Sequence, residues 1–270
     1  MCNLPFALGQ TFLGAAPESM GDSGRAATDA IESHYLNPAA LAFTKDYHMG
    51  GVFQEARIGL ETPANNYAFV VTDNSPDKFA AAGLGYVYKR SSFVDRTYID
   101  QDFSLSFAGK VLPTFSLGMQ GHRLVRQVSG GGGFVKHNLT FGTLIVPSRF
   151  LGVAVVAYDM LADDDLDLVP VIALGVHVVV LDIIRLRADI ARQEKRNPDR
   201  QGSLGLGLEI VGGYGFLVRT GGLWDNLNRQ TFWSTGLGWE GPNLSLAYAY
   251  KTNINVAGDS THTFQTWLNF

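Results

Sequence analysis

The sequence predicts an all-β fold, namely a transmembrane antiparallel β-barrel of about 14 strands. Three observations predict it. Segments that alternate apolar residues with small or polar residues recur from about Tyr47 onward, and turn residues separate them. Charged residues make up 17% of the chain, whereas soluble domains carry roughly 25%. The chain also ends in an aromatic strand with a terminal Phe270, which is typical of barrels of the bacterial outer membrane.

The composition excludes several other classes of protein. The 270 residues include one Cys, which rules out a disulfide framework and a Cys-based zinc site. A formal net charge of −4 gives no basic surface for nucleic acid, and a hydrophobic fraction of 46% is too high for a disordered chain. The uncharged stretch 168–181 has 14 residues, whereas a membrane-spanning helix needs about 20, so no such helix is expected.

Strict alternation gives each strand one apolar face and one polar or small face. A soluble sandwich would show the same pattern. The membrane barrel is favoured because aromatic residues lie near strand ends, as in the girdles of such barrels, and because the opposite faces suit a lumen better than a packed core. The last strand illustrates the apolar face, which carries His262, Phe264, Thr266, Leu268 and Phe270.

The alternating segments number 14. We expect strands at 47–60, 64–73, 79–91, 97–109, 113–127, 134–146, 150–161, 166–179, 182–193, 202–211, 214–223, 229–240, 243–252 and 260–270. An even number places both chain ends on the same side of the membrane. Connections after odd strands are long, as at 193–201, and those after even strands are tight, as at 241–243, which is typical of external loops and periplasmic turns.

The first 44 residues do not alternate. Residues 1–9 lack the basic start and full apolar core of a signal peptide but end in the small-residue pattern Ala7-Leu8-Gly9. We expect either a signal-peptide remnant or a flexible tail there. Residues 21–30 are small and helix-compatible, and the stretch 10–44 that contains them precedes the barrel at 45–270.

Two stretches carry a resemblance to a known family. Residues 21–42, GDSGRAATDAIESHYLNPAALA, resemble the N-terminal hatch of the FadL/TodX outer-membrane family, with Ala40 where that family usually has Gly. Residues 186–222 resemble the PorV-like branch of the same superfamily. The resemblance implies a 14-stranded barrel with residues 10–44 as a plug. It also implies that Asn37 and Pro38 form a plug hinge, whereas the residues themselves are equally consistent with a local turn.

The inner faces of the predicted strands suggest where function lies. Two adjacent strands turn an unusually apolar face inward, including Val156, Tyr158, Val171, His177 and Val179. The charged residues with the same inward phase on the following strands are Arg185, Arg187, Asp189, Glu209 and Arg219. An apolar wall beside guanidinium groups fits an amphiphile with an anionic head, because Arg binds a carboxylate with two hydrogen bonds.

A second interpretation of these residues stays open. The inward charges, with Asp189 and Glu209 as the candidate acids, pair across the barrel to hold its shape or to pin the plug. The apolar wall then receives the Ala-rich plug. Both interpretations are compatible with each other.

Other chemistry is not expected. The glycines at 130–133 lack the Lys-Ser/Thr that follows a phosphate loop, and the six His show no metal-ligand spacing. The acidic residues Asp163, Asp164, Asp165 and Asp167 form a solvated loop, or bridge a divalent ion to lipopolysaccharide. No motif marks a nucleophile, so we expect no enzyme, no cofactor and no resident metal.

The sequence therefore predicts an outer-membrane barrel for passive transport of a hydrophobic or amphiphilic small molecule, such as a long-chain fatty acid. Arg185, Arg187 or Arg219 would hold the anionic head. The alternative is a PorV-like barrel that does not transport and instead scaffolds a secretion or surface-attachment complex. The expected partners are outer-membrane lipid, the amphiphile and, in the alternative, a secretion or surface protein; nucleic acid is not expected.

Overall fold

The computed structural model describes residues 13–28, 30–57, 63–75, 79–93, 96–161, 170–193, 202–226 and 229–270. The predictions for residues 1–9 and for the acidic loop at 163–167 lie outside these residues.

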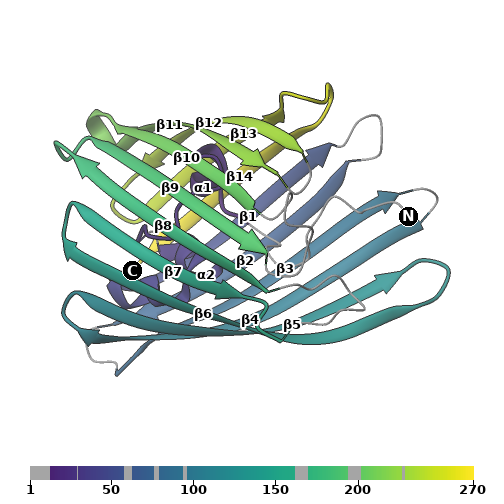
Figure 1. Cartoon of the computed structure of the whole chain (residues 1–270), viewed down its shortest axis with the longest axis horizontal. Coiled ribbons are helices and arrows are strands. Elements are labelled where there is room, and N and C mark those ends of the chain that lie inside the picture. Colours follow the sequence, from purple (N-terminus) through teal and green to yellow (C-terminus); the bar gives the residue numbers. More distant parts are fainter. Residues whose placement is uncertain are drawn as a thin grey trace.

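In the described part of the chain, 14 antiparallel strands form one closed barrel (Figure 1), which confirms the predicted fold class. The strands are β1 (Asp46–Arg57), β2 (Ala64–Asn74), β3 (Ala81–Phe93), β4 (Arg96–Leu112), β5 (Phe115–Val128), β6 (Gly133–Ser148), β7 (Leu151–Tyr158), β8 (Val171–Val180), β9 (Ile184–Gln193), β10 (Gly202–Val211), β11 (Phe216–Asp225), β12 (Gln230–Glu240), β13 (Leu244–Asn253) and β14 (Ser260–Asn269). Each strand pairs with its neighbours in sequence, and β1 pairs with β14 to close the barrel, with Phe53 opposite Phe264.

Strand bounds differ from the predicted ones by a few residues, for local reasons. β7 ends at Tyr158 rather than at 161 because Asp159 takes a left-handed backbone conformation (φ 54°), where its side chain accepts a hydrogen bond from Asn138 at 2.7 Å. β4 continues past the predicted 109 to Leu112, because a register shift after Lys110 lets it stay paired with β5.

The two ends of the barrel differ in their connections. We call the end with the connections β2–β3, β4–β5, β6–β7, β8–β9, β10–β11 and β12–β13 the turn side, and the opposite end the loop side. A short 3₁₀ turn, η4 (Gly213–Gly215), lies in the β10–β11 connection. The backbone N–H of Phe270 donates to Tyr47 O at 3.0 Å, so the end of β14 and the start of β1 lie together on the turn side.

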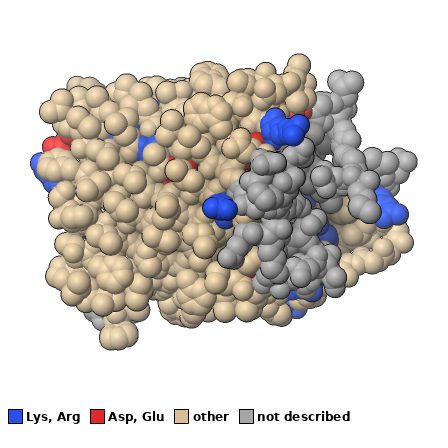
Figure 2. Space-filling model, in the orientation of Figure 1, with Lys and Arg blue, Asp and Glu red and all other residues tan. Residues whose placement is uncertain are grey.

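The residues that alternate in the sequence face alternately the inside and the outside of the barrel wall. On β7, Ala154 and Val156 are buried inside, whereas Val153 and Val155 are exposed outside. Figure 2 shows that the outer wall seen from this side carries few charged atoms. An exposed apolar band of this kind is what a membrane barrel presents to lipid.

Residues 13–44, here called the N-terminal segment, occupy the barrel interior (Figure 1). The segment contains two short helices and a 3₁₀ helix, namely α1 (Ala15–Ser19), α2 (Ala30–Leu36) and η1 (Pro38–Phe43). α1 packs against β11–β14, α2 against β1–β3, and η1 mainly against β3–β6. The segment therefore contacts the wall on several sides.

Inward-facing glycines allow the backbone of the N-terminal segment to lie directly against the wall. A Cβ at Gly142 of β6 would lie 2.0 Å from Asn37 Oδ1, and a Cβ at Gly118 of β5 would lie 2.3 Å from Ala39 N. On the opposite wall, a Cβ at Gly205 of β10 would lie 2.2 Å from Gly21 O. The small inner faces seen in the sequence are thus contact surfaces for the segment.

We predict that Gly142→Ala displaces η1 from β6. Its methyl group would overlap Asn37, and overpacking of this kind costs about 1–3 kcal/mol. Hydrogen–deuterium exchange over residues 30–44 should therefore accelerate. Gly109→Ala on β4 is the matched control, because a Cβ there meets no atom within 4 Å. Equal exchange in the two variants would contradict the prediction.

Candidate functional site

The candidate site is the contact between the N-terminal segment and the inner wall, where most of the predicted residues lie. All of them share the inward phase of their strands: Val156, Tyr158, Val171, His177, Val179, Arg185, Arg187, Asp189, Glu209 and Arg219. Asn37 and Pro38 lie in the segment itself. The structure brings these residues together in three groups rather than in one.

The first group is built on Asp189 of β9. Its Oδ2 accepts hydrogen bonds from Gly24 N at 2.8 Å, Arg25 N at 3.0 Å and Arg25 Nη1 at 2.9 Å. Arg25 Nε also donates to the hydroxyl of Tyr158 at 3.0 Å, and this hydroxyl donates to Leu36 O. Arg25 and Asp189 are both almost fully buried. The acid predicted as an ion-pair candidate thus binds the N-terminal segment.

The second group surrounds Glu209 of β10, which is fully buried. Arg185 Nη1 donates to its Oε1 at 2.7 Å, and Arg219 Nε donates to its Oε2 at 2.5 Å. Arg187 of β9 lies beside the segment, since a Cβ at Gly24 would lie 3.2 Å from its Nη1. Two of the three arginines predicted to hold an anionic head, Arg185 and Arg219, thus bind a glutamate of the wall.

The third group is the apolar wall of β7 and β8. The N-terminal segment crosses this wall at two glycines, because a Cβ at Gly152 or at Gly175 would overlap Ala26 or Arg25. On the loop side of this crossing, Val156, Tyr158, Ala173, Ala191 and Val171 pack into one apolar cluster. His177 lies level with Gly152, and Val179 lies further toward the turn side; both are half-buried.

Asn37 holds three parts of the structure together. Its Oδ1 accepts from Ala39 N at 3.0 Å and so caps η1, whose first residue is Pro38. Its Nδ2 donates to Arg25 O at 2.9 Å and to Thr143 O of β6 at 3.2 Å. This geometry accounts for Asn-Pro as a helix start, while its role as a hinge stays a prediction.

The sequence reasoning missed a buried site for His34 of α2. His34 Nδ1 lies 2.6 Å from Ser106 Oγ, and Nε2 lies 2.8 Å from Ser104 Oγ. Burial lowers the pKa of His34 to about 3, so its ring is neutral. Gly83 and Gly85 of β3 leave room for the ring, since a Cβ at either would lie within 2.6 Å of it. The alternating Ser and Gly on these strands were visible in the sequence but do not specify a histidine.

A second missed cluster holds α1. Lys251 Nζ of β13 lies 2.5 Å from Asp22 Oδ2. The carboxylate of Glu18 accepts from Gln54 Nε2 at 3.0 Å and from the hydroxyl of Thr263. Burial raises the pKa of Glu18 to about 7, although Lys251 opposes this shift.

On the loop side, the wall of β4 and β5 is charged. Arg126 makes two hydrogen bonds to Asp100, at 2.6 and 2.5 Å. His122 Nδ1 lies 3.3 Å from Asp102 Oδ2. Because the loop-side wall of β7–β9 is apolar, the described interior is amphipathic across its width.

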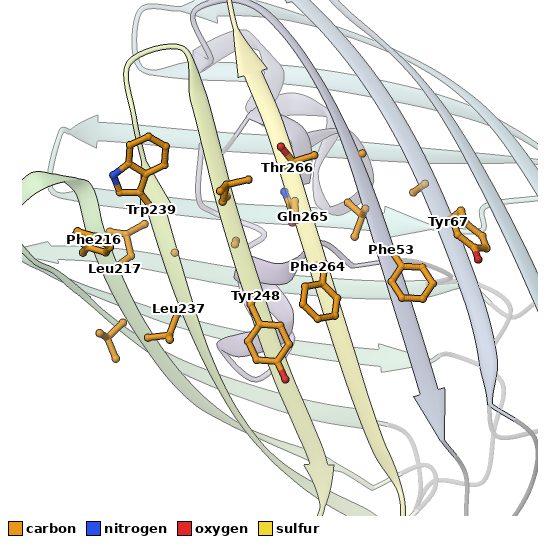
Figure 3. A pocket seen from close by; sticks show the side chains of 17 residues that line it. Phe53, Tyr67, Phe216, Leu217, Leu237, Trp239, Tyr248, Phe264, Gln265 and Thr266 are labelled. Atoms are coloured by element: carbon orange, nitrogen blue, oxygen red, sulfur yellow. The ribbon is translucent and has the colours of Figure 1, made fainter.

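A groove of about 760 Å³ lies on the outer wall over β1, β2 and β11–β14. Its aromatic residues include Phe53, Tyr67, Tyr248 and Phe264, which stand out from the strands in Figure 3. The outward Gly51 and Thr266 leave the space between them. The groove belongs to the apolar outer band and does not reach the polar groups described above.

None of the described helices has the length and hydrophobicity of a membrane-spanning helix. Nor do the described residues contain three or more His, Cys, Asp or Glu side chains grouped so that they could hold a metal ion.

The comparisons with known proteins identify the fold. No protein-family model matches the sequence, and neither does any curated protein. The chain is similar in structure to the CymD monoaromatic hydrocarbon channel, with a TM-score of 0.77, 13% identity, and coverage of 96% of this chain and 97% of CymD. It is also similar to the toluene transporter TbuX of Ralstonia pickettii (TM-score 0.72, 12% identity, coverage 97% and 99%). A third match is a FadL homologue of Pseudomonas aeruginosa (TM-score 0.69, 12% identity, coverage 98% and 99%).

These likenesses extend over nearly the whole of both chains. The chain therefore has the fold of the FadL/TodX-type channels, and the resemblance predicted from the sequence is confirmed for the fold. At 12 to 13% identity they carry no information on individual residues.

We predict that Asp189→Asn loosens the N-terminal segment. The change leaves the buried Arg25 without its charged partner, and breaking a buried pair costs about 3–5 kcal/mol. Hydrogen exchange at residues 20–28 should accelerate strongly. Asp182→Asn is the matched control, since its pair with Arg149 is exposed and contributes little. If both variants exchanged like the parent, Asp189 would not be an anchor.

We also predict that docking of α1 weakens as pH rises. The docked segment binds the Glu18 proton more tightly than the free segment, because its pKa is about 7 instead of 4.5. Stabilisation from Glu18 is therefore complete below pH 4.5 and is lost as pH rises through about 7. Hydrogen exchange at residues 14–20, corrected for the intrinsic effect of pH, measures this. Glu18→Gln should abolish the dependence, and an unchanged profile in that variant would disprove the assignment.

Proposed function

We propose that this protein is an outer-membrane channel for passive passage of hydrophobic or amphiphilic small molecules, and that the N-terminal segment is its plug. The observation that carries the proposal is a barrel with an apolar outer wall whose interior holds a segment fixed mainly by hydrogen bonds and ion pairs. Contacts of this kind are reversible, so the segment is able to leave the wall without unfolding the barrel.

The amphipathic interior supports this substrate class. A molecule that enters from the loop side meets the apolar cluster around Val156 on one side and the Asp100–Arg126 pair on the other. An apolar body packs on the first surface, and a polar end remains solvated near the second. Val171 is the partly buried member of the cluster, so we assign it to the permeant path.

The names of the structural neighbours support the same class. CymD is described as a monoaromatic hydrocarbon channel and TbuX as a toluene transporter. We extend this class to the present chain and include long-chain fatty acids. In this proposal the segment moves about Asn37 and Pro38, and its release from Asp189 and Tyr158 opens the path along β7–β9.

A reducible disulfide between the N-terminal segment and the wall tests whether the segment acts as a plug. Ala26 and Ala154 are both buried in one cluster, so Ala26→Cys with Ala154→Cys is designed to join the segment to β7, and loss of free thiols on oxidation verifies that the disulfide has formed. Cys2→Ser removes the native thiol. We expect the oxidised protein to give no uptake of labelled fatty acid or toluene into vesicles above that of protein-free vesicles, and a reductant to restore uptake.

The matched control joins two strands without touching the segment. Ala81 and Ala108 are buried partners on β3 and β4, and Ala81→Cys with Ala108→Cys should leave uptake unchanged by oxidation. Equal uptake by the locked and reduced barrels would contradict the plug. The scaffold alternative predicts no uptake in either redox state, and that result would favour it.

A further inference from the structure

The turn-side rim of the barrel is rich in exposed apolar residues. Five of its six connections carry a large, exposed apolar side chain at or beside the tip, and we call these the rim residues: Phe79, Leu112, Phe150, Leu181 and Tyr214. The sixth connection, between β12 and β13, consists of Gly241, Pro242 and Asn243. Turns that face water normally consist of small and polar residues, so this rim has the composition of a contact surface.

Two of the rim residues have a backbone conformation that does not suit their side chains. Leu181 (φ 54°) and Tyr214 (φ 59°) are left-handed, a conformation that Gly and Asn adopt at lower cost. The other left-handed residues with a side chain, within the described part of the chain, are four aspartates and an arginine. A bulky apolar residue persists in such a conformation when a contact compensates for the strain.

The chain itself does not provide that contact. Leu181 is 77% exposed and Tyr214 is 97% exposed. The turn around Tyr214 is fixed through its backbone, because Trp239 Nε1 donates to Tyr214 O at 3.2 Å and Gly212 N donates to Phe216 O at 2.7 Å. A fixed turn thus carries an exposed tyrosine, and the partner of that side chain lies outside the chain.

The rim residues continue the apolar outer wall. Leu181 follows the exposed Val180 at the end of β8 and precedes the exposed Ile183. Tyr214 lies two positions before Phe216, which stands on the outer wall beside Trp239 (Figure 3). The apolar outer surface therefore extends past the strand ends to the tips. Since this wall faces lipid, continuity favours lipid as the partner of the tips as well.

The charges at these tips also favour a lipid surface over a charged macromolecule. Arg149 and Asp182, on neighbouring connections, are both exposed and pair at 3.3 Å, so the two connections carry no net charge. The guanidinium of Arg149 also lies 4.5 Å from the ring centroid of Phe150. Aromatic rings and long side chains with a polar end are what the boundary between hydrocarbon and lipid headgroups accommodates.

We infer that the turn-side rim inserts into the membrane interface, with Leu181 and Tyr214 as lipid anchors and the β12–β13 connection in water. Contact with lipid then compensates for the left-handed backbone of both residues. The inference goes beyond the proposed transport function and holds equally for a barrel that does not transport.

Spin labels on the full chain in vesicles of dioleoyl phosphatidylcholine test the inference, with Cys2→Ser removing the native thiol. A nitroxide is attached at Leu181→Cys or Tyr214→Cys, and its collisions with oxygen, which concentrates in lipid, are compared with those with a water-soluble nickel chelate. We expect oxygen to dominate at both positions, as at Val176→Cys on the exposed face of β8. The nickel chelate should dominate at Asn243→Cys, the matched control on the same rim.

Two results would overturn the inference. Dominance of the nickel chelate at positions 181 and 214 would place the tips in water. Low collision rates with both reagents would show that protein, such as a second copy of the chain, covers them. Heat-modifiable migration on gels verifies that each labelled variant is a closed barrel.

Leu181→Asn separates lipid contact from backbone strain. Asn adopts the left-handed conformation more readily, so without lipid contact the change would stabilise the barrel. With lipid contact, loss of the leucine should lower the folding equilibrium constant in these vesicles by about tenfold, as guanidinium titration measures. Arg229→Asn is the matched control, because Arg229 is exposed and left-handed (φ 54°) on the loop side, and it should not lower the constant. Equal gains in the two variants would overturn the inference.

Discussion

The N-terminal segment lies against the barrel wall at backbone distance, and most other features of the structure depend on this close approach. Inward glycines make it possible, because a methyl group at Gly118, Gly142 or Gly205 would overlap the segment. The backbone N–H and C=O groups of the segment are then removed from water, so the wall must supply their hydrogen-bond partners. Asp189 accepts hydrogen bonds from two N–H groups of the segment, and Ser234 Oγ accepts one from Gly21 N at 3.1 Å. Steric space and hydrogen bonding thus fix the position of the segment together.

Charge inside the barrel is arranged around the same contact. Arg25 and Asp22 on the segment pair with Asp189 and Lys251 on the wall, so each of these charges needs the other element to remain buried. When the segment docks, the buried charges of the wall and those of the segment therefore both gain partners of opposite charge. Such pairs give orientation more than net stability, since their desolvation offsets much of their attraction. This balance is what the proposed plug requires, because a plug has to leave the wall and return to it.

The segment also divides the interior. On its loop side, the apolar surface of β7–β9 faces the charged surface of β4 and β5. On its turn side lies a cavity of about 380 Å³, to whose lining Arg219 and Ser245 contribute. Arg185 and Arg219 share Glu209, but only Arg219 lines that cavity. The sequence placed both arginines on the inner face, yet their different surroundings depend on where the segment crosses the wall.

The sequence by itself determined the period-two faces, the strand number and the inward residues, because in a β-strand the side-chain direction follows directly from position. The tertiary structure alone decided the partners of those residues. Asp189 binds Arg25 across 164 positions of sequence, and His34 lies between Ser104 and Ser106, which are 70 and 72 positions away. Alternation specifies that these side chains point inward, but the barrel register and the path of the segment determine what they meet.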